Sequence, residues 1–304
     1  MNRCFLCVKK IDTDANMHQT CIKNLFGVSY IPKIDIALDE ITIKAQEMAD
    51  KLSISGVQAK LSMKLDKKSK KLITAATGGE YILKPQITTY KEIPENENLC
   101  MTIADQIKID VPAHTLLMLK DGSYAYLVKR FDRRDGNKIN QEDFCQVLEK
   151  TKKEKYNGSI EQIANKLKEK SEIPNLDIQY LYERTLLSFI IGNGDAHLKN
   201  YSINYTTLDN IRLSPAYDIV SSRLVIPNEK EEFALSINGK KNKLKIEDFI
   251  TFANKLNIPQ KITDNMLSKK QLFFDLINDS QLSPDYKEKL SEIVSERFSR
   301  LIAS

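Results

Sequence analysis

The sequence predicts an α+β protein of two lobes, with a strand-rich front half and a helix-rich back half. Between residues 53 and 130, short apolar runs alternate with polar residues or stop at Pro and Gly, as β-strands do. From about residue 141 onward, apolar residues recur at helical spacing instead. This change of pattern places a seam between the lobes near residues 130–140.

Composition narrows the class of protein. The chain has 304 residues, of which 41% are hydrophobic, enough to bury a large core without disulfides. The net charge is +5, and most of the excess lies in lysine runs at 67–71, 150–155 and 240–245. Such runs are more often solvated surface than a nucleic-acid face, so direct nucleic-acid binding is not expected. No apolar run is long enough for a membrane span or a leader, which predicts a cytoplasmic protein with reduced cysteines.

The front half contains three strand signals. Its first strand alternates apolar with polar residues, with the apolar set at Leu61, Met63 and Leu65. Residues 81–84 predict a second strand, which Pro85 ends. Residues 115–119 and 124–128 flank a Lys-Asp-Gly-Ser turn and predict a hairpin.

Helices are predicted from apolar spacing. One is expected to begin after Pro94, with Leu99, Ile103 and Ile107 on one face. In the back half, the same spacing predicts four more helices, over residues 160–168, 176–191, 246–256 and 286–302.

The segment GNGDAHLKN, residues 192–200, carries the strongest chemical signal. Asp195 and Asn200 have the separation found in protein-kinase catalytic loops, where the Asp accepts the substrate hydroxyl proton and the Asn holds magnesium. Asp218, in Ser-Pro-Ala-Tyr-Asp, would be a second oxygen ligand for Mg²⁺. Taken singly, such residues are more often turn formers or caps. The ordered set favours ATP-dependent phosphoryl transfer.

Upstream segments would supply the phosphate-binding side. Ser53 to Gln58 precede the first strand, as a phosphate-covering loop does, although a plain turn explains the single Gly56 equally well. Lys84 ends a strand, the position of the phosphate-binding lysine in kinases, although strand-end lysines are usually solvated. Glu95 or Glu97 could pair with Lys84, or could simply complement a helix N-terminus.

Eight segments follow one another in a diagnostic order between residue 53 and about residue 222: SISGVQAKLSM, GGEYILKP, ENENLCMTIA, VPAH, LVKRFDRR, QEDFCQ, IIGNGDAHLKN and SPAYDIVSS. In this combination they resemble the HipA-like serine/threonine-protein kinase toxins of bacteria. The resemblance implies a two-lobed, protein-kinase-like fold with an N-lobe over residues 31–135 and a helical C-lobe over residues 136–304. Residues 1–30 would be a separate Cys/His-containing segment.

The resemblance also implies ATP and Mg²⁺ as cofactors and a set of site residues. Asp195 would be the catalytic base, and Asn200 and Asp218 the magnesium ligands. The implied ATP-binding residues are Ser55, Gly56, Val57, Gln58, Lys84, Lys129, Arg130, Phe131, Gln141, His197, Asn200 and Asp218. Backbone around Lys129, Arg130 and Phe131 would form the adenine hinge. Lys129 stands where the family often has an acidic residue, so only backbone hydrogen bonds are expected there.

Only 52 residues precede Ser53, so the chain resembles the compact HipT-type members, in which the N-terminal subdomain is a separate small protein. That likeness implies autophosphorylation at Ser53 and Ser55. A phosphate there adds about −1.5 to −2 charges beside the ATP phosphates and should inhibit the enzyme. The implied target is an aminoacyl-tRNA synthetase, whose modification would inhibit translation. The implied partners are a DNA-binding antitoxin and a small HipS-like protein.

Two other functions share part of this pattern. A small-molecule kinase of the aminoglycoside or choline type would contain the same Asp-x4-Asn loop, but the Ser-Ile-Ser loop and QEDFCQ argue against it. A non-catalytic regulatory pseudokinase is the other alternative. The presence of every expected catalytic side chain argues against that one.

The N-terminal segment contains two short chelating pairs, Cys4-x2-Cys7 and His18-x2-Cys21. Four ligands of these types within 18 residues suit tetrahedral zinc as a structural clip. Buried thiols and a surface histidine explain the pattern equally well. The remaining cysteines, Cys100 and Cys145, are expected in the core.

Overall fold

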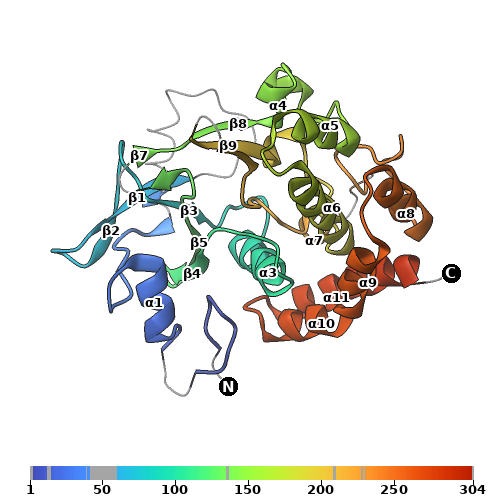
Figure 1. Ribbon diagram of the computed structural model, residues 1–304. Helices are drawn as coiled ribbons and strands as arrows, with labels where there is room; N and C mark the ends of the chain where they lie inside the picture. The colour runs from blue at the N-terminus through green and yellow to red at the C-terminus, as the bar shows by residue number, and fades with distance from the viewer. Residues whose placement is uncertain are drawn as a thin grey trace. The chain divides into compact units, whose positions relative to one another are not determined.

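The computed structural model in Figure 1 describes most of the chain: residues 3–11, 15–38, 40–41, 60–134, 137–207, 210–226, 229 and 231–302. The chain divides into two compact units. Unit 1 comprises Met1–Thr102 and Pro112–Gly136, and unit 2 comprises Ile103–Val111 and Asn137–Ser304. The short stretch Ile103–Val111 therefore belongs to unit 2, although the residues on both sides of it belong to unit 1.

Unit 1 is built on a five-stranded antiparallel sheet in the order β2-β1-β3-β5-β4. Its strands are β1 (Leu61–Asp66), β2 (Lys71–Thr74), β3 (Tyr81–Pro85), β4 (His114–Met118) and β5 (Tyr124–Lys129). The alternation predicted for β1 is confirmed, because Leu61, Met63 and Leu65 are buried. The predicted hairpin is β4 and β5, in a register that pairs Leu116 with Tyr126.

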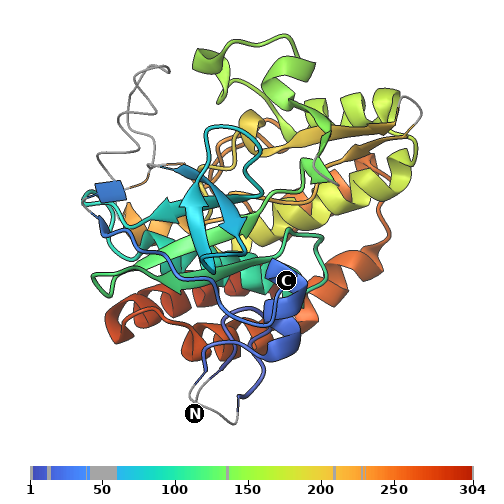
Figure 2. The ribbon, with the colours of Figure 1, turned by 90° about the vertical axis from the view of Figure 1, so that its left-hand side faces the viewer.

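Helix α1 (Gln19–Phe26) packs against this sheet, and Figure 2 shows it in blue beside the strands. The ring of Phe26 lies 5.8 Å from that of Tyr81, and the Tyr81 hydroxyl donates a hydrogen bond of 3.1 Å to the Leu25 carbonyl. The helix ends at Gly27, whose φ of +68° is the left-handed conformation that glycine adopts without strain. The N-terminal segment is therefore part of the core of unit 1.

Helix α3 (Ile93–Gln106) begins close to the predicted start, with Pro94 in its first turn, where proline removes no helical hydrogen bond. Leu99 and Ile103 are buried as expected. Cys100 is fully buried on the same helix, and Cys145 is 2% exposed, so both are core residues. The division between the units falls within α3, after Thr102.

Unit 2 contains a three-stranded sheet in the order β10-β9-β8. Its strands are β8 (Asn140–Asp143), β9 (Ser202–Thr207) and β10 (Asn210–Leu213). The expectation of helical structure from about residue 141 is wrong for β8. Its sequence, Asn-Gln-Glu-Asp, has little strand propensity, and pairing with β9 decides its conformation. Two further strands have two residues each: β6 (Arg133–Arg134), which belongs to unit 1, and β7 (Asn137–Lys138), which belongs to unit 2.

Helices make up most of unit 2 (Figure 1). They are α4 (Phe144–Val147), α5 (Ile160–Lys170), α6 (Pro174–Ile190), α7 (Ser222–Val225), α8 (Ile246–Lys255), α9 (Gln260–Ser268), α10 (Lys270–Asp279) and α11 (Pro284–Ile302), with 3₁₀ turns η1 (Lys152–Glu154) and η2 (Leu198–Asn200). The four back-half helices predicted from the sequence are α5, α6, α8 and α11. The ring centroids of Phe189 on α6 and Phe249 on α8 lie 5.1 Å apart. The Arg297 guanidinium lies 4.7 Å from the centroid of the Phe189 ring.

A largely buried charge cluster joins α11 to the loop between α7 and α8. Glu232 pairs with Arg297 at 2.9 Å and with Arg300 at 2.7 Å. Burial raises the pKa of Glu232, but the hydrogen bonds from Arg300 and the charge of Arg297 outweigh it and lower the pKa to about 2. Among the helices that the structure describes, none combines the length and apolar character needed to cross a membrane.

Candidate active site

The segment 192–200 follows the end of α6 and is itself mostly buried, with Asp195 exposed. Gly192 has a φ of +69°, and a Cβ there would lie 3.0 Å from Cγ2 of Ile293 and 3.2 Å from Cβ of Arg223. Both the left-handed backbone and the lack of space require glycine at this position. This sharp turn separates the largely buried helix α6 from the polar segment that contains Asp195.

Asp195 is exposed, yet its carboxylate is held in place. The Tyr156 hydroxyl donates a hydrogen bond of 2.7 Å to Oδ1 of Asp195. The backbone N–H of Asp195 donates to Oδ1 of Asn193 at 3.2 Å. The Tyr156 ring also meets the His197 ring edge-on, with centroids 5.3 Å apart. Asp195 thus presents a restrained carboxylate at the surface of unit 2, as a general base requires.

Asn200 and Asp218 are in direct contact. The Asn200 side chain accepts a hydrogen bond of 3.1 Å from the His197 N–H and donates one of 3.1 Å to Oδ2 of Asp218. Asp218 has a φ of +60°, a conformation uncommon for residues other than glycine and frequent at functional sites. An amide oxygen and a carboxylate side by side are hard ligands of the kind that Mg²⁺ prefers. The donor set therefore fits the predicted metal.

Hydrogen bonds of the two residues before Asp218 fix the position of its backbone. The Tyr217 hydroxyl donates a hydrogen bond of 3.0 Å to the Lys199 carbonyl and also pairs with Ser202. The N–H of Ala216 donates to the carbonyl of Asp110 at 2.7 Å. Asp218 is consequently tied both to the loop that holds Asn200 and to the short segment of unit 2 contributed by residues 103–111.

Gly194 packs against a carboxyl group that the sequence did not point to. Its N–H donates a hydrogen bond of 2.7 Å to the Ser222 hydroxyl, which donates in turn to Glu229 at 2.7 Å. A Cβ on Gly194 would lie 2.6 Å from Cδ of Glu229. Burial raises the pKa of Glu229, and the nearby charge of Asp195 raises it further. Glu229 is thus a second carboxyl group beside the 192–200 segment.

His197 and Gln141 were both predicted to line the ATP site. His197 is buried, and burial lowers its pKa, which favours the neutral ring. Its buried Nδ1 has no hydrogen-bond partner among the described residues. Gln141 is half-buried on β8, opposite Asn204 of β9. A buried ring nitrogen of this kind can take a hydrogen bond from a ligand, and the role of His197 at the ATP site stays a prediction.

In unit 1, Lys84 forms a buried ion pair. Its Nζ lies 2.6 Å from Oε1 of Glu97, and the two side chains are only 12% and 1% exposed. Lys84 lies on β3 and Glu97 on α3, so the pair joins the sheet to the helix. Of the two candidate glutamates, Glu97 is therefore the partner of Lys84. Burial raises the pKa of the other, Glu95.

The predicted adenine hinge begins at Lys129, the last residue of β5. The N–H of Lys129 donates to the Ala113 carbonyl and that of Arg130 to the Glu80 carbonyl, each at 2.8 Å. These two donors are used within unit 1, so adenine hydrogen bonds would fall to other backbone atoms of residues 129–131. The Arg130 guanidinium pairs with both oxygens of Asp132 at 2.9 and 2.7 Å.

The predicted phosphate loop lies outside the described residues. Ser53, Ser55, Gly56, Val57 and Gln58 all belong to it, so their roles stay predictions. The four residues of the N-terminal chelating pairs are described, and they come together. The ligand atoms of Cys4, Cys7, His18 and Cys21 all lie within 4.8 Å of one another.

Four residues of this site were not predicted: Asn193, Tyr156, Ser222 and Glu229. Asn193 lies within the recognised loop, and its signal was the Asx turn that an Asn two residues before an Asp can form. The other three come from segments 28 to 39 positions away from the loop residues that they contact. Only the tertiary fold brings these three residues to the 192–200 segment, so no local spacing in the sequence predicts them.

A strand-rich unit with a buried Lys–Glu pair and a helical unit with an Asp-x4-Asn loop together define a protein-kinase-like α+β fold. The model of the HipA-like C-terminal domain matches residues 52–272. The chain therefore belongs to the family of HipA-like C-terminal domains.

Two curated relatives illustrate the family. Y4dM of Sinorhizobium fredii, named provisionally as a kinase, is 35% identical over 220 residues, which cover 67% of this chain and 53% of the relative. The serine/threonine-protein kinase toxin HipA of Shewanella oneidensis is 25% identical over 242 residues, covering 72% and 54%. The chain thus spans about half the length of these two relatives.

Solved structures confirm the fold class. HipA of Shewanella oneidensis MR-1, in complex with HipB and operator DNA, superposes with a TM-score of 0.70 at 23% identity, covering 82% of this chain and 65% of that one. The Helicobacter pylori proinflammatory kinase CtkA gives a TM-score of 0.55 at 15% identity, covering 78% and 93%. At these identities the likeness concerns the fold alone.

Proposed function

We propose that this protein is an ATP- and Mg²⁺-dependent serine/threonine-protein kinase that acts as the toxin of a bacterial toxin–antitoxin system. The observation that carries the proposal is the contact between Asn200 and Asp218. Asn200 lies five residues after Asp195, which is exposed and held by Tyr156. Family membership supports it, since the relative from Shewanella oneidensis is named a serine/threonine-protein kinase toxin.

Each side chain has a defined part in the proposed reaction. Asp195 accepts the proton of the protein hydroxyl that attacks the γ-phosphate of ATP. Asn200 and Asp218 hold Mg²⁺, which when bound neutralises charge on the phosphate oxygens. Lys84 holds the α- and β-phosphates, and its pairing with Glu97 fixes the position of the ammonium group. His197 and Gln141 contact the nucleotide.

The proposal extends to substrates and partners. Ser53 and Ser55 are the autophosphorylation sites, and an aminoacyl-tRNA synthetase is the external target, whose modification inhibits translation. A DNA-binding antitoxin and a small HipS-like protein are the partners. The structure of Shewanella oneidensis HipA with HipB and operator DNA supports an antitoxin of this kind.

The direct test is phosphate transfer from labelled ATP to total cell protein, with aminoglycosides and choline as competing acceptors. Asp195→Asn should lower transfer by roughly 10²- to 10⁴-fold while nucleotide binding persists. Asp285→Asn is a matched control, because that carboxylate is 67% exposed on α11. Full activity of Asp195→Asn, or transfer to a small amine in place of protein, would refute the proposal.

Two further measurements address the finer claims. Phosphoproteomics after brief expression of the active protein, compared with Asp195→Asn, should identify the target as a modified synthetase. Replacing both Ser53 and Ser55 by Ala should remove the phosphate that the enzyme adds to itself. Unchanged incorporation in that variant, measured by mass spectrometry, would exclude these serines as the sites.

A further inference from the structure

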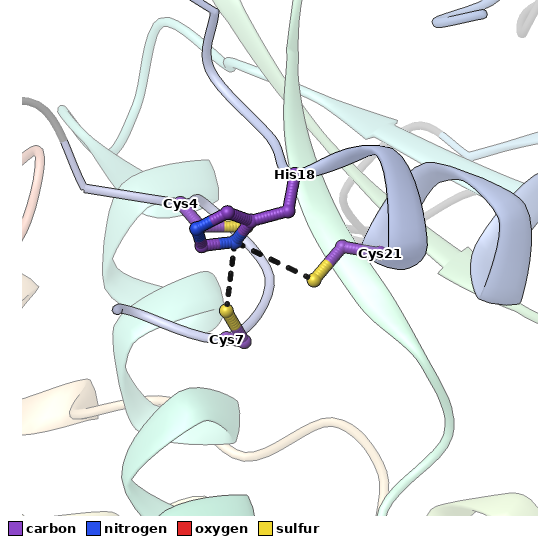
Figure 3. Close-up of side chains that lie close together, drawn as sticks. All are labelled: Cys4, Cys7, His18 and Cys21. Carbon is purple, nitrogen blue, oxygen red and sulfur yellow. Dashed lines mark hydrogen bonds between the residues drawn. The ribbon is translucent and has the colours of Figure 1, made fainter. Parts of the chain in front are cut away.

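Four side chains of the N-terminal segment converge in unit 1, and none of them is among the residues assigned to phosphoryl transfer. Figure 3 shows Cys7 and Cys21 pointing toward the same edge of the His18 ring. Their sulfur atoms lie 3.3 and 3.9 Å from Nδ1 of His18. With Cys4, the four ligand atoms are all within 4.8 Å of one another, and all the thiols are free.

These distances fit one tetrahedral metal ion. With Zn–S bonds of about 2.3 Å and Zn–N bonds of about 2.0 to 2.1 Å, ligand atoms at the corners of a tetrahedron lie roughly 3.5 to 3.8 Å apart. The two measured sulfur-to-nitrogen distances bracket that range. Disulfide bonding, by contrast, needs sulfur atoms about 2.05 Å apart, and would leave His18 without a role.

The second ring nitrogen of His18, Nε2, also has a hydrogen-bond partner. This nitrogen lies 2.8 Å from the carbonyl of Lys10, so the ring donates its proton there. This contact fixes the tautomer that leaves Nδ1 with its lone pair directed at the thiols. A histidine ligand oriented by a backbone carbonyl is the usual outer-shell arrangement at zinc sites.

The backbone holds the two chelating pairs rigidly. Cys4 and Cys7 lie in a tight turn, in which the N–H of Val8 donates to the Cys4 carbonyl at 2.9 Å and that of Cys4 to the Lys9 carbonyl at 3.0 Å. His18 is the N-cap residue of α1, and Cys21 lies three residues on, in the first helical turn. The spacing i, i+3 places these two side chains on one face of the helix.

Two of the four ligands are buried and tie the cluster to the core, while Cys7 and His18 are partly exposed. Cys4 is 1% exposed and Cys21 7%, and both pack with Met17 and Leu25 in the core of unit 1. The segment that carries Cys4 and Cys7 has little regular structure of its own. A cross-link from that turn to α1 would therefore fix it against the sheet.

We propose that Cys4, Cys7, His18 and Cys21 bind one Zn²⁺ ion as a structural clip. Binding replaces the protons of three thiols, which pass to solvent, and leaves a Cys₃His site with a net charge of −1. All four positions are filled by protein, so the ion has no open site for chemistry. The proposal is independent of phosphoryl transfer, because it is tested by metal content.

The experiment measures metal in the full-length protein purified without chelator. Elemental analysis should give one equivalent of zinc. Cobalt(II) exchanged into the site should show the intense d–d and sulfur-to-metal charge-transfer bands of tetrahedral thiolate coordination. Removing the ion with a strong chelator should lower the Tm, and adding back zinc should restore it.

Variants locate the site. Cys7→Ser replaces the cysteine ligand that is only partly buried, so it should fold while losing most of its zinc. His18→Asn gives a second, chemically different removal of one ligand. Cys145→Ala is the control, because that thiol is buried in unit 2 and should leave the zinc content at one equivalent.

Three results would overturn the proposal. Folded protein containing less than a tenth of an equivalent of zinc, and taking up none when it is added, would exclude the site. A disulfide among the three N-terminal cysteines, found by mass spectrometry, would assign the cluster to redox bonding instead. Unchanged zinc content in both Cys7→Ser and His18→Asn would place the ion elsewhere.

Discussion

The hydroxyl of Tyr156 donates a 2.7 Å hydrogen bond to Oδ1 of Asp195, the residue proposed as the catalytic base. Tyr156 lies just after η1, and its ring also packs edge-on against His197. Burial raises the pKa of Tyr156, and the hydrogen bond to Asp195 raises it further, so the phenol stays protonated and donates. The Tyr156 side chain therefore restrains the proposed catalytic carboxylate and packs against His197, a predicted nucleotide-binding residue.

Tyr156→Phe should separate these two roles, because it keeps the ring and removes the hydroxyl. A hydrogen bond to a charged group contributes about 1.5 kcal/mol or more, so we expect kcat to fall about tenfold. KM for ATP should stay unchanged, since the contact with His197 remains. Steady-state kinetics measure both values. Tyr286→Phe on α11 is the control, and an unaltered kcat in Tyr156→Phe would remove the tyrosine from the mechanism.

The ion pair of Lys84 and Glu97 should show strong energetic coupling. In Lys84→Met, the Glu97 carboxylate, which is 1% exposed, loses its cation, and we expect a cost of about 3 kcal/mol in the free energy of unfolding. In Lys84→Met with Glu97→Gln, the buried charge is gone, and part of the stability should return. Urea unfolding of the parent, Lys84→Met, Glu97→Gln and the double variant completes a double-mutant cycle for the free energy of unfolding.

A coupling energy above about 1 kcal/mol is expected from that cycle. Strict additivity would mean that the pair contributes nothing as a pair. Both single variants should also lose phosphate transfer. The double variant should recover stability without recovering activity, because the phosphate-binding ammonium group is still missing.

The Glu232 cluster predicts a specific loss of stability in acid. The pKa of Glu232 is lowered from 4.5 to about 2, so the folded state binds its proton more weakly than the unfolded state. Its contribution, about 3 kcal/mol, is therefore complete above pH 4.5 and disappears as the pH falls toward 2. Glu232→Gln should be less stable than the parent at pH 7, and the difference should shrink across that window.

Glu296→Gln is the matched comparison for Glu232. It also contacts Arg297 and Arg300, but its side chain is 52% exposed, so its loss should cost less than about 1 kcal/mol. Chemical unfolding at several pH values measures both variants. Equal effects of the two substitutions would show that the burial of Glu232 has no energetic consequence.

Gly194 should tolerate no side chain while Glu229 is present. The Cβ of Gly194→Ala would lie 2.6 Å from Cδ of Glu229, so that carboxyl group must move away from Ser222. Displacing the neighbouring Asp195 by even about 1 Å can cost up to 10²-fold in rate, and we expect at least a tenfold loss of kcat. In a Glu229→Ala background, the same substitution should change kcat less than threefold, since the space is then open. Equal losses in both backgrounds would contradict the steric explanation.

The sequence predicted much of the fold where its periodicity was regular. The alternation in β1 and the helical spacing of α5 and α8 were sufficient, because each has one face in the core. The choice between Glu95 and Glu97 could not be made, since two positions along a helix point about 200° apart, at 3.6 residues per turn, and the rotation of α3 was unknown. For β8, local propensity pointed away from a strand, and the pairing with β9 that overrides it is a long-range contact.

Candidate site residues divided in the same way. Asp195 and Asn200 were predicted from their separation within one loop, and Asp218 from its place downstream of that loop. The structure brings Asn200 and Asp218 into contact. Tyr156 and Glu229 reach the loop from other segments, through contacts that exist only in the folded chain. Lys84 was placed correctly at a strand end, but only the structure shows its contact with a glutamate.

Residues 103–111 lie between two stretches of unit 1 yet belong to unit 2, and the Asp110 carbonyl accepts the N–H of Ala216, two positions before Asp218. Neither unit is therefore a contiguous stretch of chain that could be excised and expressed by itself. A fragment beginning at residue 137 would lack the backbone on which the Asp218 loop rests. During synthesis, Asp110 leaves the ribosome long before Ala216. The hydrogen bond between the Asp110 carbonyl and the Ala216 N–H can therefore form only after Ala216 has been made. The segment before Asp218 is thus expected to become ordered only after residue 216 has been made.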